Sequence, residues 1–173
     1  MKRLVTLLAL FSCALSFAQA IPQLDKAQGK RVSFSYQYSL SRDGGDFSDV
    51  TTGEVIVEGN AYKIDGLGLA IYSDGETRWT QDTDAQELVI EAVDKQEITV
   101  NPALLIASYK NYRKDLQVVG GTENSLDVIY TVDADTKARF VLTGIKYQEP
   151  QGKSDLTLEV KSLPSTYVIT DLR

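Results

Sequence analysis

An unbroken alternation of apolar and polar residues constrains the fold of this chain more than any other feature. Residues 32–40 read VSFSYQYSL. Successive side chains of a β-strand point to opposite faces, so a period of two predicts a half-buried antiparallel strand with hydroxyl and amide groups on its polar face. The apolar face of this strand carries Val32, Phe34, Tyr36, Tyr38 and Leu40.

Further short strands follow, separated by turn residues. Asp43-Gly44-Gly45 predicts a turn, and Asn60 and Asp74-Gly75 are hairpin signals. We predict further strands at residues 53–58, 61–65, 67–73, 77–81, 86–92, 116–119, 126–131, 138–146, 155–160 and 166–172. About ten or eleven strands are too many for one flat sheet, so the sheet must curl into a barrel or half barrel, or split into two layers.

One segment, residues 101–109, breaks the period of two. Asn101 can cap a helix, and Pro102 suits the first helical position, where no backbone N–H is required. A helix of about two turns here carries more apolar surface than it can bury on itself, so we expect it to lie against the sheet. Two interpretations stay open: an ordinary connection that covers the core, or a lid over a cavity.

The first 20 residues are typical of an export signal. Lys2 and Arg3 precede an uncharged apolar run over residues 4–17, which is shorter than the roughly 20 residues that a membrane-spanning helix needs. Ala18-Gln19-Ala20 offers small residues to a signal peptidase, so we predict cleavage after Ala20 and a single domain over residues 21–173. The alternative is a lipid anchor at Cys13, because Leu10-Phe11-Ser12-Cys13 weakly resembles a lipoprotein-processing box.

Composition excludes several classes of function. The chain has no histidine, and its one cysteine is Cys13, which excludes Ser-His-Asp and Cys-His catalysis and zinc sites built on His or Cys. Without Lys2 and Arg3, 16 of the 18 basic residues remain against 24 acidic ones, and the net charge of −8 disfavours nucleic acids and anionic membranes.

Carboxylate chemistry is the remaining option for catalysis, and the sequence gives it little support. Asp82-Thr83-Asp84 is the nearest approach to a calcium loop, and we interpret it as a solvated turn. No acidic pair stands in the arrangement that a carboxylate-based hydrolase requires. We therefore expect no catalytic residue, no metal site and no cofactor.

Four segments occur in an order and spacing that match a known family. They are Gly53-Glu54-Val55-Ile56-Val57, Ala61-Tyr62-Lys63-Ile64, Asp74-Gly75-Glu76-Thr77-Arg78-Trp79 and Asn101-Pro102-Ala103-Leu104-Leu105-Ile106. In the LolA-type carriers of outer-membrane lipoproteins, a G-x-L-x-V strand leads to an aromatic-containing strand, a DG-x-T-x-W hairpin and a short P-x-x-L-I helix. The chain resembles this family well over residues 53–111 and loosely elsewhere.

The resemblance implies a mainly β fold, an unclosed antiparallel β-barrel around a hydrophobic cavity with a short helical lid. Such a carrier is a periplasmic monomer without cofactor or nucleotide. It accepts an acylated lipoprotein from an inner-membrane ABC transporter, shields the acyl chains and passes them to an outer-membrane acceptor. Ordinary core packing is the alternative role for each residue of the implied site. Together with the alternating face, the resemblance predicts a cavity lined by Phe34, Tyr36, Tyr38, Val55, Val57, Tyr62, Ile64, Leu69, Ile71 and Trp79, and a lid made of Pro102, Leu104, Leu105 and Ile106.

Two departures from the family leave a second function open. Well-known members carry a basic residue tied to lid opening just after the G-x-L-x-V strand, where this chain has Gly59. Only residues 21–30 precede the first strand, whereas the family opens with a longer amphipathic helix. The alternative is therefore an envelope protein of LolA fold that binds another lipid or senses the state of the envelope.

Overall fold

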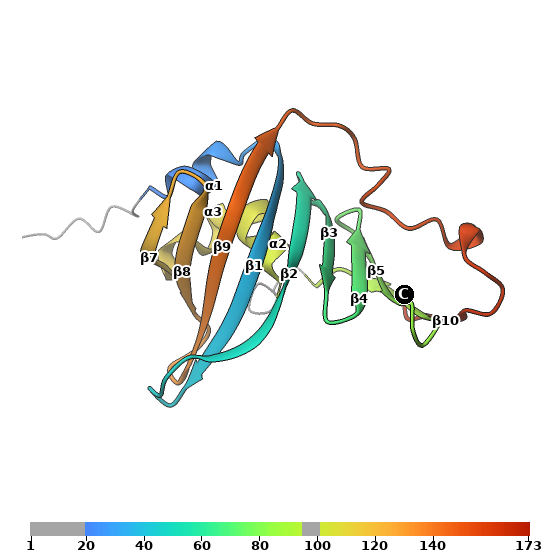
Figure 1. Cartoon of the computed structure of the whole chain (residues 1–173), viewed down its shortest axis with the longest axis horizontal. Helices are drawn as coiled ribbons and strands as arrows, with labels where there is room; N and C mark the ends of the chain where they lie inside the picture. Colours follow the sequence, from blue (N-terminus) through green and yellow to red (C-terminus); the bar gives the residue numbers. More distant parts are fainter. Residues whose placement is uncertain (1–19, 95–100) are drawn as a thin grey trace, which may run out of the picture.

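One curved sheet organises the chain (Figure 1). The computed structural model describes residues 20–94 and 101–173. The predicted export signal, apart from Ala20, lies outside these residues, and so does Cys13. The strands are β1 (Arg31–Arg42), β2 (Ser48–Glu58), β3 (Ala61–Gly66), β4 (Leu69–Ser73), β5 (Thr77–Asp82), β6 (Glu87–Ala92), β7 (Leu116–Thr122), β8 (Ser125–Thr131), β9 (Thr136–Gln148) and β10 (Val168–Asp171).

The sheet has ten strands in the order β10-β6-β5-β4-β3-β2-β1-β9-β8-β7. Neighbouring strands pair antiparallel, except that β10 runs parallel to β6. Strands β7 and β10 lie at opposite edges, so the sheet is unclosed. The prediction of a mainly β chain with an unclosed, curved sheet is confirmed.

Short helices make up the rest of the regular structure. They are α1 (Pro22–Lys26), α2 (Pro102–Ala107) and α3 (Tyr109–Tyr112), with 3₁₀ turns η2 (Arg113–Asp115) and η3 (Val160–Ser162). Helix α2 falls where the sequence predicts a helix, whereas α1 was not predicted. Within the described residues, no helix has the length and apolar character needed to cross a membrane.

The strand register divides the sheet into two faces. Phe34 of β1 pairs with Val55 of β2, which pairs with Ile64 of β3, and these side chains are buried beneath the helices. We call this the helix-covered face, and the other the opposite face. Ser33 and Ser35 of β1 point to the opposite face, as the alternation in the sequence predicts.

Two glycines shape the helix-covered face beside Tyr36. Gly53 pairs with Tyr36 across β1 and β2, and Gly66 pairs with Gly53 across β2 and β3. A Cβ atom on Gly53 would lie 2.8 Å from Cε1 of Tyr36, and one on Gly66 would lie 3.2 Å from the Tyr36 hydroxyl oxygen. The aromatic ring therefore lies over backbone where any other residue would place a side chain.

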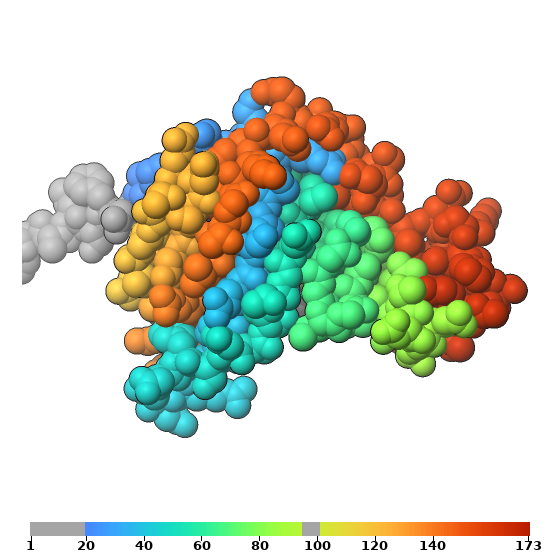
Figure 2. Space-filling model, in the orientation of Figure 1, coloured from blue at the N-terminus to red at the C-terminus, as the bar shows by residue number. Residues whose placement is uncertain are grey.

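The C-terminal strap, residues 149–167, crosses the opposite face and joins β9 to β10. Figure 2 shows this segment, in orange and red, lying against the green strands. Glu58 accepts hydrogen bonds from the backbone N–H groups of Gln151 at 2.9 Å and Gly152 at 3.0 Å. Asp155 pairs with Arg31, and Gln81 donates a hydrogen bond to the Tyr167 hydroxyl at 2.9 Å. These contacts hold both ends of the strap to the sheet.

The predicted strand at residues 155–160 is wrong. Residues 154–157 form turns and bends, and η3 begins at Val160. The backbone carbonyl of Leu156 accepts one hydrogen bond from the Ser73 N–H at 3.1 Å, and the Leu156 side chain is fully buried. The strap is thus held by a buried side chain, ionic contacts and single hydrogen bonds rather than by a ladder.

Candidate functional site

Helix α2 is the central element of the candidate site. Its start follows the sequence prediction: the Asn101 side-chain oxygen accepts a hydrogen bond from the Ala103 N–H at 3.0 Å, and Pro102 occupies the first turn. Every residue from Pro102 to Ile106 is buried. A six-residue helix with no exposed face before Ala107 is held by its surroundings, because so short a helix is marginal alone.

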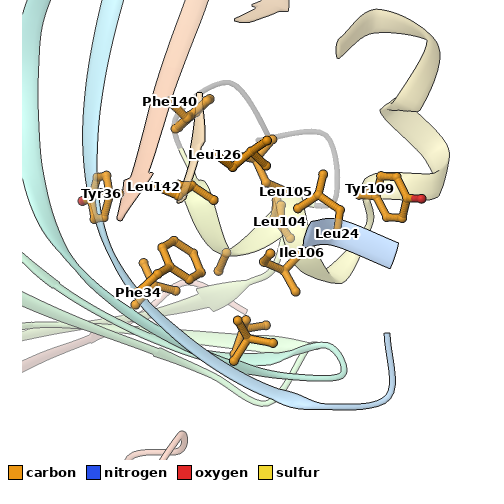
Figure 3. Close-up of a cluster of buried hydrophobic side chains, with 14 of the residues drawn as sticks. Leu24, Phe34, Tyr36, Leu104, Leu105, Ile106, Tyr109, Leu126, Phe140 and Leu142 are labelled. Carbon is orange, nitrogen blue, oxygen red and sulfur yellow. The ribbon is translucent and has the colours of Figure 1, made fainter. Parts of the chain in front are cut away.

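The surroundings of α2 come from segments far apart in the sequence. Its main neighbours in the sheet are β2 and β3. Leu24 of α1 and Tyr109 of α3 are also buried in the same cluster, and the Tyr109 hydroxyl bonds to Asp25. Gln28 donates a hydrogen bond to the Ile106 carbonyl at 3.4 Å. Figure 3 shows Leu104, Leu105 and Ile106 of α2 in one cluster with Leu126 and Leu142 of the sheet, so side chains fill this interior.

One row of side chains leads out of this filled interior along the helix-covered face. The register aligns Ile64 with Ile71, Ile71 with Thr80 and Thr80 with Val89. Burial falls along the row: Phe34, Val55 and Ile64 are at most 5% exposed, whereas Ile71, Thr80 and Val89 are half-buried. We call this the apolar row; its members are Phe34, Val55, Ile64, Ile71, Thr80 and Val89.

The structure brings most of the predicted cavity residues together. Those in the buried cluster are Phe34, Tyr36, Tyr38, Val55, Val57, Tyr62 and Ile64, with Leu104, Leu105 and Ile106 of the predicted lid against them. Pro102 is also buried. Leu69 and Ile71 lie on the same face, half-buried, beyond the part of the sheet that α2 covers. Burial raises the pKa values of Tyr36 and Tyr38 above the usual phenol value, as expected for rings in an apolar interior.

Trp79 does not belong with the other predicted cavity residues. It pairs with Tyr72 on β4 and Ile90 on β6, and all three point to the opposite face. The hairpin motif predicted the strand β5 correctly but not the face to which Trp79 points. Successive side chains of a strand point to opposite faces. Arg78 and Thr80 therefore take the helix-covered face, and Trp79 points away from it.

Several buried residues of the interior were missed by the sequence analysis. Leu24 comes from the unpredicted helix α1, and Tyr109 begins α3. Leu126, Phe140 and Leu142 come from β8 and β9, where alternation in residues 138–142 was a usable signal. A helix as short as α1 gives too few periods to be recognised.

Two recesses lie beside the C-terminal half of α2. The first has a volume of about 240 Å³ and is lined by residues of α2, α3 and the turns after β2 and β4. The second, of about 190 Å³, lies between α2 and residues 27–30, which follow α1. Asn60 and Ala107 line both recesses.

The side chains at this site suit binding by apolar contact. Within residues 20–94 and 101–173, no group of three or more Asp, Glu or Cys side chains is arranged to hold a metal ion. The buried Arg31 and Glu58 and the exposed Asp155 form an ionic group on the opposite face, which holds the C-terminal strap. Apolar side chains make up the described interior around α2.

Comparison with known proteins leaves the family open. No protein-family model matches the chain, and no curated protein matches it. Among solved structures, the chain is similar to an uncharacterized conserved protein from Thermus thermophilus, with 9% sequence identity and a TM-score of 0.48, over 86% of this chain and 94% of that one. A likeness this distant does not indicate what the chain binds.

Proposed function

We propose that this protein is a periplasmic carrier of LolA type that shields the acyl chains of lipoproteins and moves them toward the outer membrane. The observation that carries the proposal is the apolar row, which begins under α2 at Phe34 and ends half-buried at Val89. A long acyl chain laid along it would be covered where the row is deep and reached from solvent where it is shallow.

The dimensions and energetics of the row are compatible with this role. Six strands at about 4.8 Å spacing give a row about 24 Å long, comparable with a long acyl chain. Each buried methylene is worth about 0.8 kcal/mol, so shielding even half of one chain stabilises the complex appreciably. Apolar contact supplies this affinity without a rigid fit, which lets a carrier release its cargo.

Access to the deep part of the row requires α2 to move. Leu104, Leu105 and Ile106 fill the interior where the acyl chains would lie. Their contacts with the sheet are apolar, so an acyl chain can replace them at little cost in hydrogen bonds. In this proposal α2 acts as a lid, because it leaves the interior when an acyl chain enters.

The partners in this proposal are those that the resemblance to LolA-type carriers implies. The carrier would take its cargo from an inner-membrane ABC transporter and deliver it to an outer-membrane acceptor, acting as a monomer after cleavage behind Ala20. If Cys13 were lipidated instead, the protein would be an anchored acceptor. The intact mass of the mature chain distinguishes the two.

A second candidate is an envelope protein of the same fold that binds a different lipid or senses envelope state. The observation that favours it is Gly59, which has φ +60° in the turn between β2 and β3. A basic residue there would adopt this left-handed conformation at a cost. Gly59 has no side chain, so it cannot make the gating contact that a basic residue makes at this position in the family.

Ligand recovery with two matched variants tests the proposal. The full chain is purified from the periplasm, and bound molecules are identified by mass spectrometry. Acylated lipoproteins are expected; a free lipid or glycolipid favours the second candidate, and no apolar ligand at all contradicts both. Ile71→Gln puts an amide in the apolar row and should reduce recovery about tenfold. Ala70→Gln, on the same strand but the opposite face, should leave recovery unchanged.

A further inference from the structure

The larger recess beside α2 differs in chemistry from the apolar row. It lies where the C-terminal end of α2 meets the turn after β2, the turn after β4 and the end of β6. Its volume is about 240 Å³, enough for a small polar group and too small for a whole acyl chain. We call it the α2 recess.

The wall of the α2 recess is built by close contact between two turns. Gly75, after β4, approaches Asn60, after β2, so closely that a Cβ on Gly75 would lie 2.7 Å from the Asn60 Cβ. The Gly75 N–H donates to the Ser73 hydroxyl oxygen at 3.0 Å, and the Val93 N–H donates to the Glu76 carbonyl at 2.8 Å. The Val93 bond joins the end of β6 to the turn after β4, and the close approach of Gly75 to Asn60 places the turn after β2 beside them.

The polar groups of the α2 recess are uncharged. Asn60 and Asn111 contribute amides and Ser108 a hydroxyl, and the described lining contains no Asp, Glu, Lys or Arg. On the strands that lead to the recess, Arg78 and Glu91 pair with each other at 3.0 Å. A ligand group with uncharged donors and acceptors finds partners here, whereas an isolated ionised group would be desolvated without a counter-charge.

Leu104 connects the α2 recess to the interior. Its side chain is 5% exposed and belongs to the buried cluster, and it also lines the recess. Val93, the residue directly after β6, also lines the recess. It follows Val89 of the apolar row by four residues, an even number, so both side chains point to the same face of the sheet. A ligand whose apolar part lies along the half-buried part of the row, at Ile71, Thr80 and Val89, can therefore place its polar end in the recess while α2 stays in place.

We infer that the α2 recess binds the uncharged polar head of an acyl ester, such as a glyceride, whose chain lies along the half-buried part of the apolar row. The inference rests on the proposed acyl-chain binding and adds the class of head group and the place where it binds. The side chains of Asn60, Ser108 and Asn111 supply the hydrogen bonds. A fatty acid, which carries a carboxylate at the same end, is discriminated against.

A pair of ligands with the same chain tests this inference. Binding of 1-monolauroylglycerol and of laurate to the full chain is measured at pH 7.4 by displacement of an environment-sensitive fluorescent probe. We expect the glyceride to bind about tenfold more tightly or better, because the carboxylate loses its hydration among described lining residues that include no cation.

Two tryptophan variants test the location. Asn111→Trp fills the α2 recess and should weaken glyceride binding about tenfold, whereas Lys110→Trp, on the neighbouring exposed residue that does not line the recess, should leave it unchanged. Equal affinity for the two ligands, or glyceride binding that Asn111→Trp does not change, overturns the inference and leaves acyl-chain binding standing. Failure of both ligands to bind contradicts the proposed function itself.

Discussion

Arg31 Nη1 lies 3.4 Å from Glu58 Oε2, and the register places the two residues directly opposite each other on β1 and β2. Both side chains are largely buried, at 5% and 11% exposure. Arg31 also donates to the Gly152 carbonyl at 3.1 Å and pairs with Asp155, while Glu58 accepts from the backbone of the strap. One cross-strand pair therefore holds the C-terminal strap to the sheet.

Removing the cation should destabilise the fold. Arg31→Met leaves the Glu58 carboxylate without its cationic partner, so the free energy of unfolding should fall by more than it does when an exposed pair is broken. Urea denaturation measures this difference. Glu149→Gln is the control, because the Lys30–Glu149 pair is exposed and such pairs contribute at most about 1 kcal/mol. Equal effects of the two variants would show that the buried pair does not hold the strap.

The same group makes stability depend on pH. Hydrogen bonds from the Gln151 and Gly152 N–H groups, with Arg31, lower the pKa of Glu58 below its usual 4.5, and the hydrogen bond from Arg31 lowers that of Asp155 below 3.8. Since both folded-state pKa values lie below the unfolded ones, the stabilisation is fully present above the unfolded values and is lost as pH falls through the folded ones. Denaturation midpoints should therefore drop as the pH is lowered below 4.5, and less steeply in Arg31→Met. Parallel curves for the two proteins would contradict this account.

Leu67 lies in the turn between β3 and β4 and is unusual in two ways. It is a large apolar residue that is 73% exposed, and it has a left-handed backbone with φ +55°. A left-handed backbone costs a leucine about 1 kcal/mol, whereas asparagine tolerates it. Leu67→Asn should therefore raise the free energy of unfolding by up to about 1 kcal/mol. Leu69→Asn, two residues later and half-buried on the helix-covered face, should lower it. A destabilised Leu67→Asn protein would mean that this leucine makes contacts that outweigh its backbone strain.

Gly53 should not tolerate a side chain. A Cβ there would lie 2.3 Å from the Asp65 carbonyl oxygen and 2.8 Å from Tyr36 Cε1. Gly53→Ala should thus cost about 2 kcal/mol or more, because both Tyr36 and the β3 backbone would have to shift. Gly120→Ala is the matched control, since its Cβ would meet only Asp127 Cβ at 3.9 Å. Thermal unfolding compares the two, and similar melting temperatures would show that Tyr36 can leave its position over Gly53.

Local signals in the sequence predicted much of the architecture. The alternation in β1, the turn residues between strands and the Asn101-Pro102 start of α2 each depend on a few neighbouring residues, and each is observed. They also predicted that most of the cavity residues would share one face, since alternation fixes which side chains point the same way. The residues contributed by α1 were missed because five helical residues leave no readable period.

Only the tertiary structure decided which face of each strand is covered, and by what. Trp79 follows the alternation of its own strand, but whether that side meets α2 depends on the register across the strand pairs that lead from β1 to β5. The C-terminal strap is held by partners far away in the chain, Arg31 and Glu58, and β10 pairs parallel with the distant strand β6. The sequence by itself determined a mainly β chain with one capped helix, because those choices are local; long-range pairing determined the filled interior, because burial is a property of two surfaces in contact.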